Sequence, residues 1–335
     1  MLRFIARRLV ALLFVLVGLS VITFTISHVV PGDPARLAAG PQARPEQVET
    51  VRKELGLDKP LPYQYAVYMK GLLRLDLGKS IRTMRPVRDD IGDYFPATVE
   101  LAVAAALLCV IVGLPFGVAS AVNKDRPLDH ASRLFSLSGV SMPTFWLGLV
   151  LQLLLFKVFH LLPIGGRIDP FLDVPQRITG LYTVDALLTG NWAAFASALQ
   201  HLVMPALTLA YSSLAVVTRM TRSTMVETMA QDYIRTARAK GLADGDVIYR
   251  HALKNAVIPT VTVMGLQFGY LLSGTFLVET IFAWPGMGQY GVQSVMALDI
   301  PAIMGVTLLV AVVYVLTNLV VDLLYVWLDP RIDYV

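Results

Sequence analysis

Long apolar runs alternate with polar segments along this chain. Crossing a hydrocarbon layer of roughly 30 Å takes about 20 helical residues, and six runs approach or exceed that length. Because backbone groups in lipid must be hydrogen-bonded within their own segment, each run is predicted to be a helix and the fold all-α. The predicted spans lie near Leu9–Val30, Ala97–Val122, Leu134–Leu161, Leu202–Thr218, Ala256–Val278 and Ala302–Leu328.

The fifth predicted span carries small and polar residues along its length. Small residues recur every four positions at Gly265, Gly269 and Ser273, a spacing that lets a neighbouring helix approach closely. Packing inside a bundle and lining of a transport pathway are both compatible with this pattern. The polar positions that we predict to line a pathway are Thr262, Gln267 and Thr275.

Prolines and charged residues interrupt several predicted spans. Pro143 and Pro205 each remove a backbone donor, so both are expected bending points. Charged groups within a span are costly. We expect four of them to reach the membrane interface, because each lies near a predicted helix end: Glu100, Lys157, Glu279 and Asp322.

The composition agrees with a membrane protein of many spans. Of the 335 residues, 56% are hydrophobic and 16% charged, and the net charge is +4. The mean hydropathy is +0.62. Basic residues are scattered over the loops and form no continuous stripe, which argues against nucleic-acid binding. The single cysteine, Cys109, excludes an intramolecular disulfide.

The distribution of Lys and Arg predicts the orientation in the membrane. If the N-terminus is inside, the short outer loops carry two and none, whereas the inner segments carry three in 1–8, three in 123–133 and seven in 219–255. This bias places both termini in the cytoplasm. The first apolar run has no A-x-A site after it, so we interpret it as a retained helix and not as a signal peptide.

The long segment 31–96 is then outside the cell, since long loops are translocated largely regardless of charge. Its start is polar and rich in turn-forming residues, and helical periodicity follows. Pro45 and Glu46 are predicted to open a helix that ends at Gly56. We expect the segment to fold as a small cap over the outer mouth.

The polar segment 219–256 is basic and favours helices. Met225–Lys240 is rich in strong helix formers and ends at Gly241, a favourable residue after a helix C-terminus. Leu242–Gly245 is predicted to be a turn, and Asp246–Asn255 a further helix. A basic helical segment cannot lie in hydrocarbon, so it projects into the cytoplasm. It is either a plain connector with surface charges or a contact for a soluble partner.

The sequence gives no sign of an enzyme. Gly78-Lys79-Ser80 resembles the end of a phosphate-binding loop, but Leu73 stands where the first glycine is required. The five histidines are far apart and have no metal-ligand spacing. We predict no catalytic residue, no metal site and no cofactor on this chain. ATP with Mg²⁺, where it is used, is bound by a partner.

A series of motifs resembles one known family over almost the whole chain. The most specific are DYIRTARAKGL at 232–242 and HALKNAVIPTVTVMGLQFG at 251–269. Others follow in order: PGDP at 31–34, LGLDKP at 55–60, SMPTFW at 141–146, RMTRS at 219–223, ETIFAWPGMG at 279–288 and LDPRI at 328–332. They are similar to permeases of bacterial ABC importers of the dipeptide/oligopeptide class, including the glutathione members.

Two positions depart from the usual patterns. The broader importer family begins its loop motif with a glutamate where this chain has Arg235, as in the peptide branch. The GDLG usual in the peptide class reads Leu75-Asp76-Leu77-Gly78 here.

The resemblance implies a type I ABC importer permease, a single domain over 1–335 with six transmembrane helices and a large outer loop between the first two. It implies the bacterial inner membrane, a second permease (a homologue or a second copy), two cytoplasmic ATPases and an extracytoplasmic peptide-binding protein. The family's ATPase-coupling helix carries over to Asp232, Arg235, Thr236, Ala237, Arg238, Lys240 and Gly241. A bulky residue at position 241 is expected to abolish ATP-dependent uptake.

Two other classes of protein compete with this interpretation. A proton-coupled secondary transporter of peptides or other small polar solutes requires carboxylates near mid-membrane, and an ionophore would abolish its uptake. A membrane-embedded enzyme requires His, Asp or Ser groups clustered at one depth. Neither pattern is evident. The resemblance leaves the transported solute open among peptides, glutathione, nickel and opines.

Overall fold

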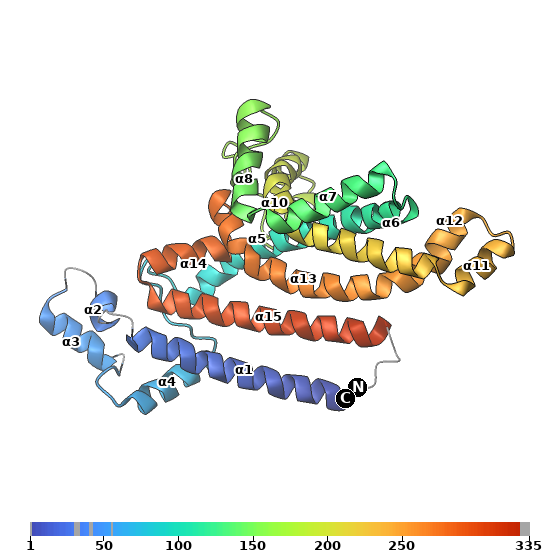
Figure 1. Ribbon diagram of the computed structural model, residues 1–335. Coiled ribbons are helices and arrows are strands. Elements are labelled where there is room, and N and C mark those ends of the chain that lie inside the picture. The colour runs from blue at the N-terminus through green and yellow to red at the C-terminus, as the bar shows by residue number, and fades with distance from the viewer. Residues whose placement is uncertain (1, 30–33, 40–42, 55, 329–335) are drawn as a thin grey trace. The chain divides into compact units, whose positions relative to one another are not determined.

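The computed structural model describes residues 2–29, 34–39, 43–54 and 56–328, and helices joined by loops make up that part of the chain (Figure 1). These residues form no strand, only an isolated antiparallel bridge between Lys79 and Pro86. The all-α prediction is therefore confirmed. Most of the PGDP and LDPRI motifs lies outside the described residues.

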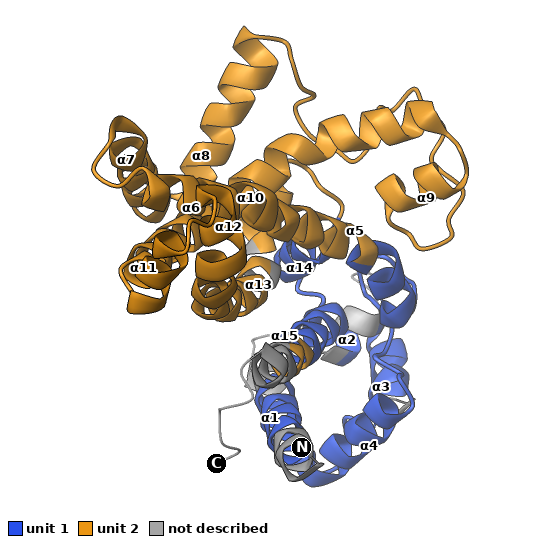
Figure 2. Ribbon diagram, turned by 90° about the vertical axis from the view of Figure 1, so that its right-hand side faces the viewer, with its two compact units in different colours: residues 1–95, 286–315 blue, residues 96–285, 316–335 orange. Residues whose placement is uncertain are grey.

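The chain divides into two compact units (Figure 2). Unit 1 comprises residues 1–95 and 286–315, and unit 2 comprises residues 96–285 and 316–335. Each unit has its own hydrophobic core. The helices of unit 1 are α1 (Leu2–Val29), α2 (Pro34–Ala39), α3 (Pro45–Glu54), α4 (Leu61–Leu73), the start of α5 (Val87–Leu108), α14 (Met287–Met296) and the first part of α15 (Ile300–Leu328).

Helices α1 and α4 lie side by side in unit 1 through aromatic and hydroxyl contacts. The hydroxyl groups of Ser20 and Tyr65 are 2.8 Å apart, and the ring of Phe24 meets the Tyr65 ring edge-on at 5.3 Å. Helix α3 begins at Pro45 as predicted. The chain leaves it at Gly56, whose φ of 64° closes the turn.

The turn after α4 takes the left-handed conformation without a glycine. Leu75 has a φ of 57°, and the Asp76 N–H donates to the Gly71 carbonyl at 2.9 Å. Most L-residues avoid this conformation because Cβ approaches the following carbonyl oxygen. The departure from GDLG at Leu75 therefore leaves the tight turn in place.

Two buried carboxylates organise the rest of unit 1. Asp299 accepts hydrogen bonds from the Ser80 hydroxyl at 2.5 Å and from the Arg82 N–H at 3.0 Å. Asp90 accepts one from the Tyr290 hydroxyl at 3.1 Å. Burial, together with the neighbouring Asp90 charge, raises the pKa of the Tyr290 phenol. These contacts join the α14–α15 connection to the segment that precedes α5, and α14 to the start of α5.

Unit 2 is built around one long helix, α10 (Trp192–Met229). Helices from the whole unit pack against it. Between residues 96 and 285 the helical elements of unit 2 besides α10 are, in chain order, the rest of α5, the π-helical turn η1 (Cys109–Gly113), α6 (Leu114–Val122), α7 (Pro127–Ser141), α8 (Thr144–Leu151), the π-helical turn η2 (Gln152–Val158), α9 (Tyr182–Leu188), α11 (Asp232–Ala239), α12 (Asp244–Asp246), the π-helical turn η3 (Val247–Ala252) and α13 (Leu253–Ile281).

Among the described residues, three helices are long and apolar enough to cross a membrane: Val87–Val122, Trp192–Met229 and Ile300–Val320. The count rises to five if each of two bent pairs is one span, and a shorter apolar helix covers Val10–Thr25. The number of six spans is therefore not confirmed.

The third predicted span is not one straight helix. Its two halves, Pro127–Ser141 and Thr144–Val158, are bent by 110°. Met142 between them is extended, with φ −84° and ψ 125°, because a residue that precedes proline is driven out of the helical region. Pro143 is thus a bending point, as predicted. By contrast, α10 continues through Pro205 as a single helix.

Glu100 and Glu279 do not reach an interface, and that prediction was wrong. Both are buried. Thr98 donates to the Glu279 carboxylate at 2.6 Å, and Arg167 donates to the Glu100 carboxylate at 2.5 Å. Burial is tolerated because donors inside the protein replace water. Lys157 is exposed, and the side chain of Asp322 lies outside those described.

Candidate functional site

The predicted coupling segment is a short helix with turns at both ends. The long helix expected from Met225 breaks after Met229, and α11 begins at Asp232 after the extended residue Gln231. It ends as predicted at Gly241, which has a φ of 76° and donates its N–H to the Arg238 carbonyl at 2.9 Å. Figure 1 shows α11 and α12 together at one end of unit 2.

One side of α11 is buried against four other elements. Ile234 and Ala237, three residues apart and hence on one face, are the two buried residues of this helix. They belong to a cluster, here called the seat of α11, whose other buried members are Val118, Ala121, Met225, Val247, Ala252 and Ala256. These residues come from α6, α10, η3 and α13. A displacement of α11 therefore reaches the ends of all four elements through this cluster.

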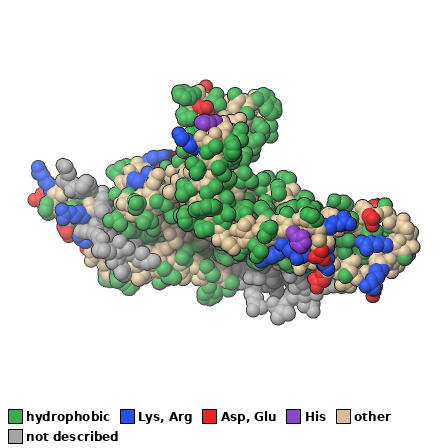
Figure 3. All heavy atoms as spheres, turned by 45° about the horizontal axis from the view of Figure 1, so that its top comes forward, with side chains coloured by type: hydrophobic (Ala, Val, Ile, Leu, Met, Phe, Trp, Pro, Cys, Tyr) green, Lys and Arg blue, Asp and Glu red, His purple; other side chains and the backbone are tan. Residues whose placement is uncertain are grey.

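The opposite side of α11 is exposed and rich in charge. Arg235 pairs with Asp232 at 3.0 Å, and both side chains remain largely exposed. Arg238 and Lys240 are also exposed. Within unit 2, Figure 3 shows charged side chains gathered at the end that carries α11, whereas hydrophobic side chains dominate the middle. This face suits a soluble partner with acidic groups.

The seven residues predicted for coupling thus divide into two groups. Ala237 is buried in the seat of α11, where it cannot touch a partner. The other six are exposed on or beside α11: Asp232, Arg235, Thr236, Arg238, Lys240 and Gly241. Two aromatic residues that sequence reasoning missed, Tyr233 and Tyr249, are exposed on the same segment. Tyr233 also accepts a hydrogen bond from Asn255 at 2.8 Å.

The residues predicted to line a pathway lie on α13, against α10. The Thr262 hydroxyl donates to the Ile258 carbonyl of its own helix at 3.2 Å. Gln267 accepts a hydrogen bond from Ser213 of α10 at 2.9 Å. Gly269 and Thr275 are buried and Gly265 is half-buried, while the side chain of Ser273 lies outside those described. These contacts fit helix packing, and the lining of a pathway stays a prediction.

At the N-terminal end of α10 the structure assembles a buried polar cluster that sequence reasoning missed. The guanidinium of Arg167 donates to Glu100 and to the Gly180 carbonyl at 3.0 Å. It also lies 3.7 Å from the centre of the Tyr182 ring. The Glu100 carboxylate accepts two further bonds, from the N–H and the hydroxyl of Thr183, each at 2.7 Å. The cluster fixes the 162–181 loop onto α5 and α9.

Asp185 holds the same loop in place from the first turn of α9. Its carboxylate accepts hydrogen bonds from the N–H groups of Thr179 at 2.7 Å and Gly180 at 2.8 Å. Burial opposes ionisation of this carboxyl, but these bonds and those from the Thr179 hydroxyl and the Ile178 N–H hold its pKa below the ordinary value.

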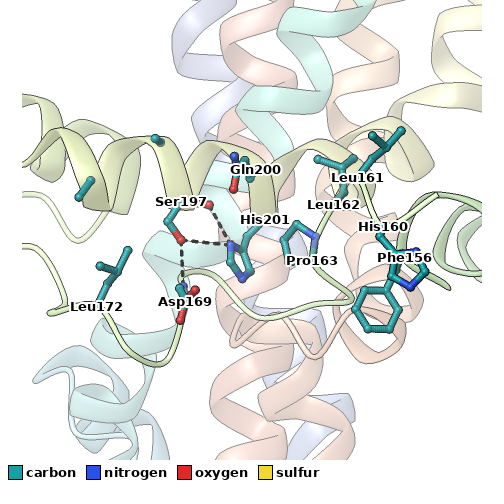
Figure 4. A pocket seen from close by; sticks show the side chains of 12 residues that line it. Phe156, His160, Leu161, Leu162, Pro163, Asp169, Leu172, Ser197, Gln200 and His201 are labelled. Atoms are coloured by element: carbon teal, nitrogen blue, oxygen red, sulfur yellow. Dashed lines mark hydrogen bonds between the residues drawn. The ribbon is translucent and has the colours of Figure 1, made fainter. Parts of the chain in front are cut away.

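A cavity of about 500 Å³ opens beside this end of α10 (Figure 4). His201 and Ser197 form part of its lining with Asp169, and apolar walls come from Phe156, Leu161, Leu162, Pro163 and Leu172. The His201 Nδ1 lies 2.8 Å from the Ser197 carbonyl and 3.5 Å from its hydroxyl. Since Nδ1 donates to that carbonyl, it is no base for the serine, and the trio lacks the arrangement of a nucleophile and its base.

Comparison with known proteins identifies the family of this chain. The chain belongs to the family described as "Binding-protein-dependent transport system inner membrane component", which matches residues 113–334. The N-terminal part of that kind of component matches residues 1–102. The class of protein is therefore a membrane permease of a transport system, and the predicted resemblance to dipeptide/oligopeptide-class ABC permeases is confirmed.

Three relatives show how closely the chain follows this class. It is 52% identical over 326 residues to the probable D,D-dipeptide transport system permease protein DdpB of Escherichia coli K12, covering 97% of this chain and 96% of the relative. It is 44% identical to the dipeptide transport system permease protein DppB of Alkalihalophilus pseudofirmus, over all of both chains. The glutathione transport system permease protein GsiC of Escherichia coli O6:H1 is 40% identical, also over all of both chains.

Proposed function

We propose that this chain is the permease subunit of an ATP-driven importer of di- or oligopeptides. It forms half of the translocation pathway with a second permease, and α11 is the contact through which two cytoplasmic ATPases move it. ATP and Mg²⁺ are bound by those partners, and an extracytoplasmic binding protein delivers the peptide. The chain lies in the bacterial inner membrane with both termini in the cytoplasm. The names of the relatives support the solute class.

One observation carries the coupling role: the two-sided character of α11. A connector with surface charges needs no buried side, yet Ile234 is fully buried in the seat of α11. The same eight-residue helix exposes Arg235 and Arg238. A helix this short is unstable alone, so its shape is set by the seat. A partner that binds the exposed side and shifts α11 therefore also moves the ends of α6, α10, η3 and α13.

The glycine at the end of α11 gives the sharpest test. No atom lies within 4 Å of a Cβ built on Gly241, but its positive φ opposes an L side chain. A valine is therefore strained by about 1–2 kcal/mol and also adds bulk at the proposed docking surface. We expect Gly241→Val to abolish ATP-dependent peptide uptake in membrane vesicles while the protein still inserts.

Gly245 supplies the matched control for this experiment. It too has open space around its Cβ position, but its φ lies outside the left-handed region. Gly245→Val should therefore keep uptake. Gly241→Asn separates the two effects, because asparagine tolerates the left-handed conformation but still adds bulk. Normal uptake by Gly241→Val would overturn the coupling role of this turn.

The source of energy separates this proposal from a proton-coupled transporter. Uptake should require ATP in vesicles that also contain the ATPases, and it should survive an ionophore that collapses the proton gradient. Glu100 and Glu279 are buried and accept hydrogen bonds from Arg167 and Thr98, so both carboxylates already serve contacts within the protein. Uptake by the purified chain alone, driven by a proton gradient, would contradict the proposal.

A further inference from the structure

A buried carboxylate joins α6, α7 and α10 close to the seat of α11. Asp129, in the first turn of α7, is fully buried. It accepts hydrogen bonds from the Ser120 hydroxyl of α6 at 2.7 Å and from the Asp125 N–H of the α6–α7 turn at 3.0 Å. Arg133 of α7 donates to it at 2.6 Å. The same carboxylate therefore fixes both ends of the turn.

The strongest contact of this carboxylate comes from α10. Arg222 donates from Nη2 to one Asp129 oxygen at 2.8 Å and from Nε to the other. Two parallel bonds of this kind fix the relative orientation of the two groups as well as their separation. We call Asp129 and Arg222 the inner clamp. The two residues are 93 positions apart in the chain, so the clamp is a tertiary contact.

Glycines bring the helices joined by the clamp into close contact. A Cβ on Gly117 of α6 would lie 2.6 Å from Thr221 of α10. A Cβ on Gly139 of α7 would clash with Ala215 of α10. The Thr218 hydroxyl adds a hydrogen bond to the Gly113 carbonyl at 3.3 Å. Such close packing leaves little room for sliding, so α6 and α7 follow α10.

The clamp and the seat of α11 share one stretch of α10. Arg222 precedes Met225 by three residues, which is about 4.5 Å along a helix axis, and Met225 is fully buried in the seat. On α6, Ser120 binds the clamp and the adjacent Ala121 belongs to the seat. A displacement of α11 is therefore transmitted to a part of α10 that lies within one helical turn of the clamp.

We propose that the inner clamp is a positioning device for coupling: Asp129 and Arg222 make the α6–α7 turn move as one body with α10 and α11. Motion received at α11 then passes along α7 to the bend at Met142–Pro143. This inference rests on the proposed function of α11 and adds a second connection between the coupling segment and the bundle. Asp129 and Arg222 touch neither solute nor nucleotide in this role.

Stability alone does not require such a contact. Replacing a buried ion pair by apolar residues of similar volume is often neutral or stabilising. A helix N-terminus such as that of α7 is satisfied by a neutral Ser or Asn. A bidentate Arg–carboxylate contact between distant segments is instead suited to hold the two segments in a fixed orientation while one of them is moved.

The test measures how many ATP molecules are hydrolysed per peptide imported. The complete importer, with its ATPases and binding protein, is reconstituted in vesicles with Asp129→Asn or Arg222→Lys. Asparagine removes the charge, whereas lysine keeps the charge but loses the two-pronged contact. We expect the ATP consumed per peptide to rise by about fivefold in both, within the range by which mutations alter coupling between sites. This ratio does not depend on how much protein accumulates.

Asp185→Asn is the matched control, because Asp185 is also a buried carboxylate in the first turn of a helix of unit 2. It lies at the other end of α10, so it should lower thermal stability without changing the ratio. If Asp129→Asn does not accumulate, Arg222→Lys decides the matter. An unchanged ratio in Arg222→Lys overturns the inference, as does a ratio that rises equally in Asp185→Asn. Uptake by Gly241→Val at the normal level would instead overturn the coupling role of α11 itself.

Discussion

The two ends of α10 use the same chemistry in different surroundings. At its N-terminal end, Glu100 and Arg167 are both almost fully buried, and they hold a loop of the same unit. At its C-terminal end, Asp129 is buried but Arg222 keeps about a fifth of its side chain exposed, next to a helix with an exposed cationic face. Figure 2 shows α9 and α11 at opposite ends of unit 2. A buried ion pair alone therefore does not mark a functional site. What distinguishes the two pairs is whether an exposed, charged surface lies next to them.

The largest effect is expected from removing the cation at the α9 end. Arg167→Ala leaves Glu100 buried with the Thr183 donors alone. Loss of one member of a buried ion pair costs about 3–5 kcal/mol. We expect a steep fall in accumulation and in the thermal unfolding temperature in detergent.

The double variant Glu100→Leu/Arg167→Met checks this explanation. It removes both charges, so it should be more stable than Arg167→Ala. If the double variant loses as much stability as the sum of the losses in Glu100→Leu and Arg167→Met, the pair is not the cause and this half of the comparison fails.

A somewhat smaller effect is expected from the buried side of α11. Ile234→Ala removes a fully buried side chain from the seat of α11 and should cost about 3 kcal/mol, within the range for buried Ile→Ala changes. Because α11 depends on the seat for its shape, ATP-dependent uptake should fall further than the amount of protein does. If uptake falls only in proportion to the amount of protein, the result contradicts a coupling role for α11. Thr236→Ala, on the exposed side of the same helix, is the control for stability alone and should cost about 0.5 kcal/mol or less.

Sequence patterns predicted several local features of the molecule well. The end of α11 at Gly241, the helix from Pro45 and the bend at Pro143 all follow from rules about single residues and their neighbours. The class of permease followed from motifs spread over the whole chain, and the relatives confirm it. Each of the local features depends on a short stretch of sequence, and each motif of the family is itself short, which is why both were predictable.

Pairings between distant segments were not predictable. Glu100 and Arg167 are 67 positions apart, and nothing local marks them as partners. The usable signal was the charge of Glu100 in an otherwise apolar run, but the expectation that Glu100 reaches the interface hid it. The long helix from Met225 to Lys240 failed for a related reason. Helix propensity ignores the tertiary contacts of Ile234 and Ala237, which hold α11 as a separate piece.

A moderate, pH-dependent effect is expected at Asp185. Its folded pKa is lowered, so its ionised form stabilises the fold above the unfolded-state pKa of about 3.9, and this contribution is lost as the pH falls through the folded value. Asp185→Asn should cost roughly 2 kcal/mol at neutral pH. The difference from the unmodified chain should shrink below about pH 4. A difference that stays constant as the pH falls from about 4 to about 2 would mean that the charge of Asp185 is not what holds the loop.

The smallest effect on stability is expected at the exposed cations of α11, and it isolates docking from folding. Arg238 and Lys240 are exposed, and charge changes at such positions alter stability by about 0.5 kcal/mol or less. Arg238→Glu/Lys240→Glu should therefore unfold at the same temperature as the unmodified chain. Yet both charges face the proposed partner, so association with the ATPases should weaken and lose part of its salt dependence. Arg177→Glu, an exposed cation near the α9 end, should leave that association unchanged. If Arg238→Glu/Lys240→Glu binds the ATPases as well as Arg177→Glu does, the cationic face of α11 is an ordinary solvated surface. The two ends of α10 then differ less than their exposed charges indicate.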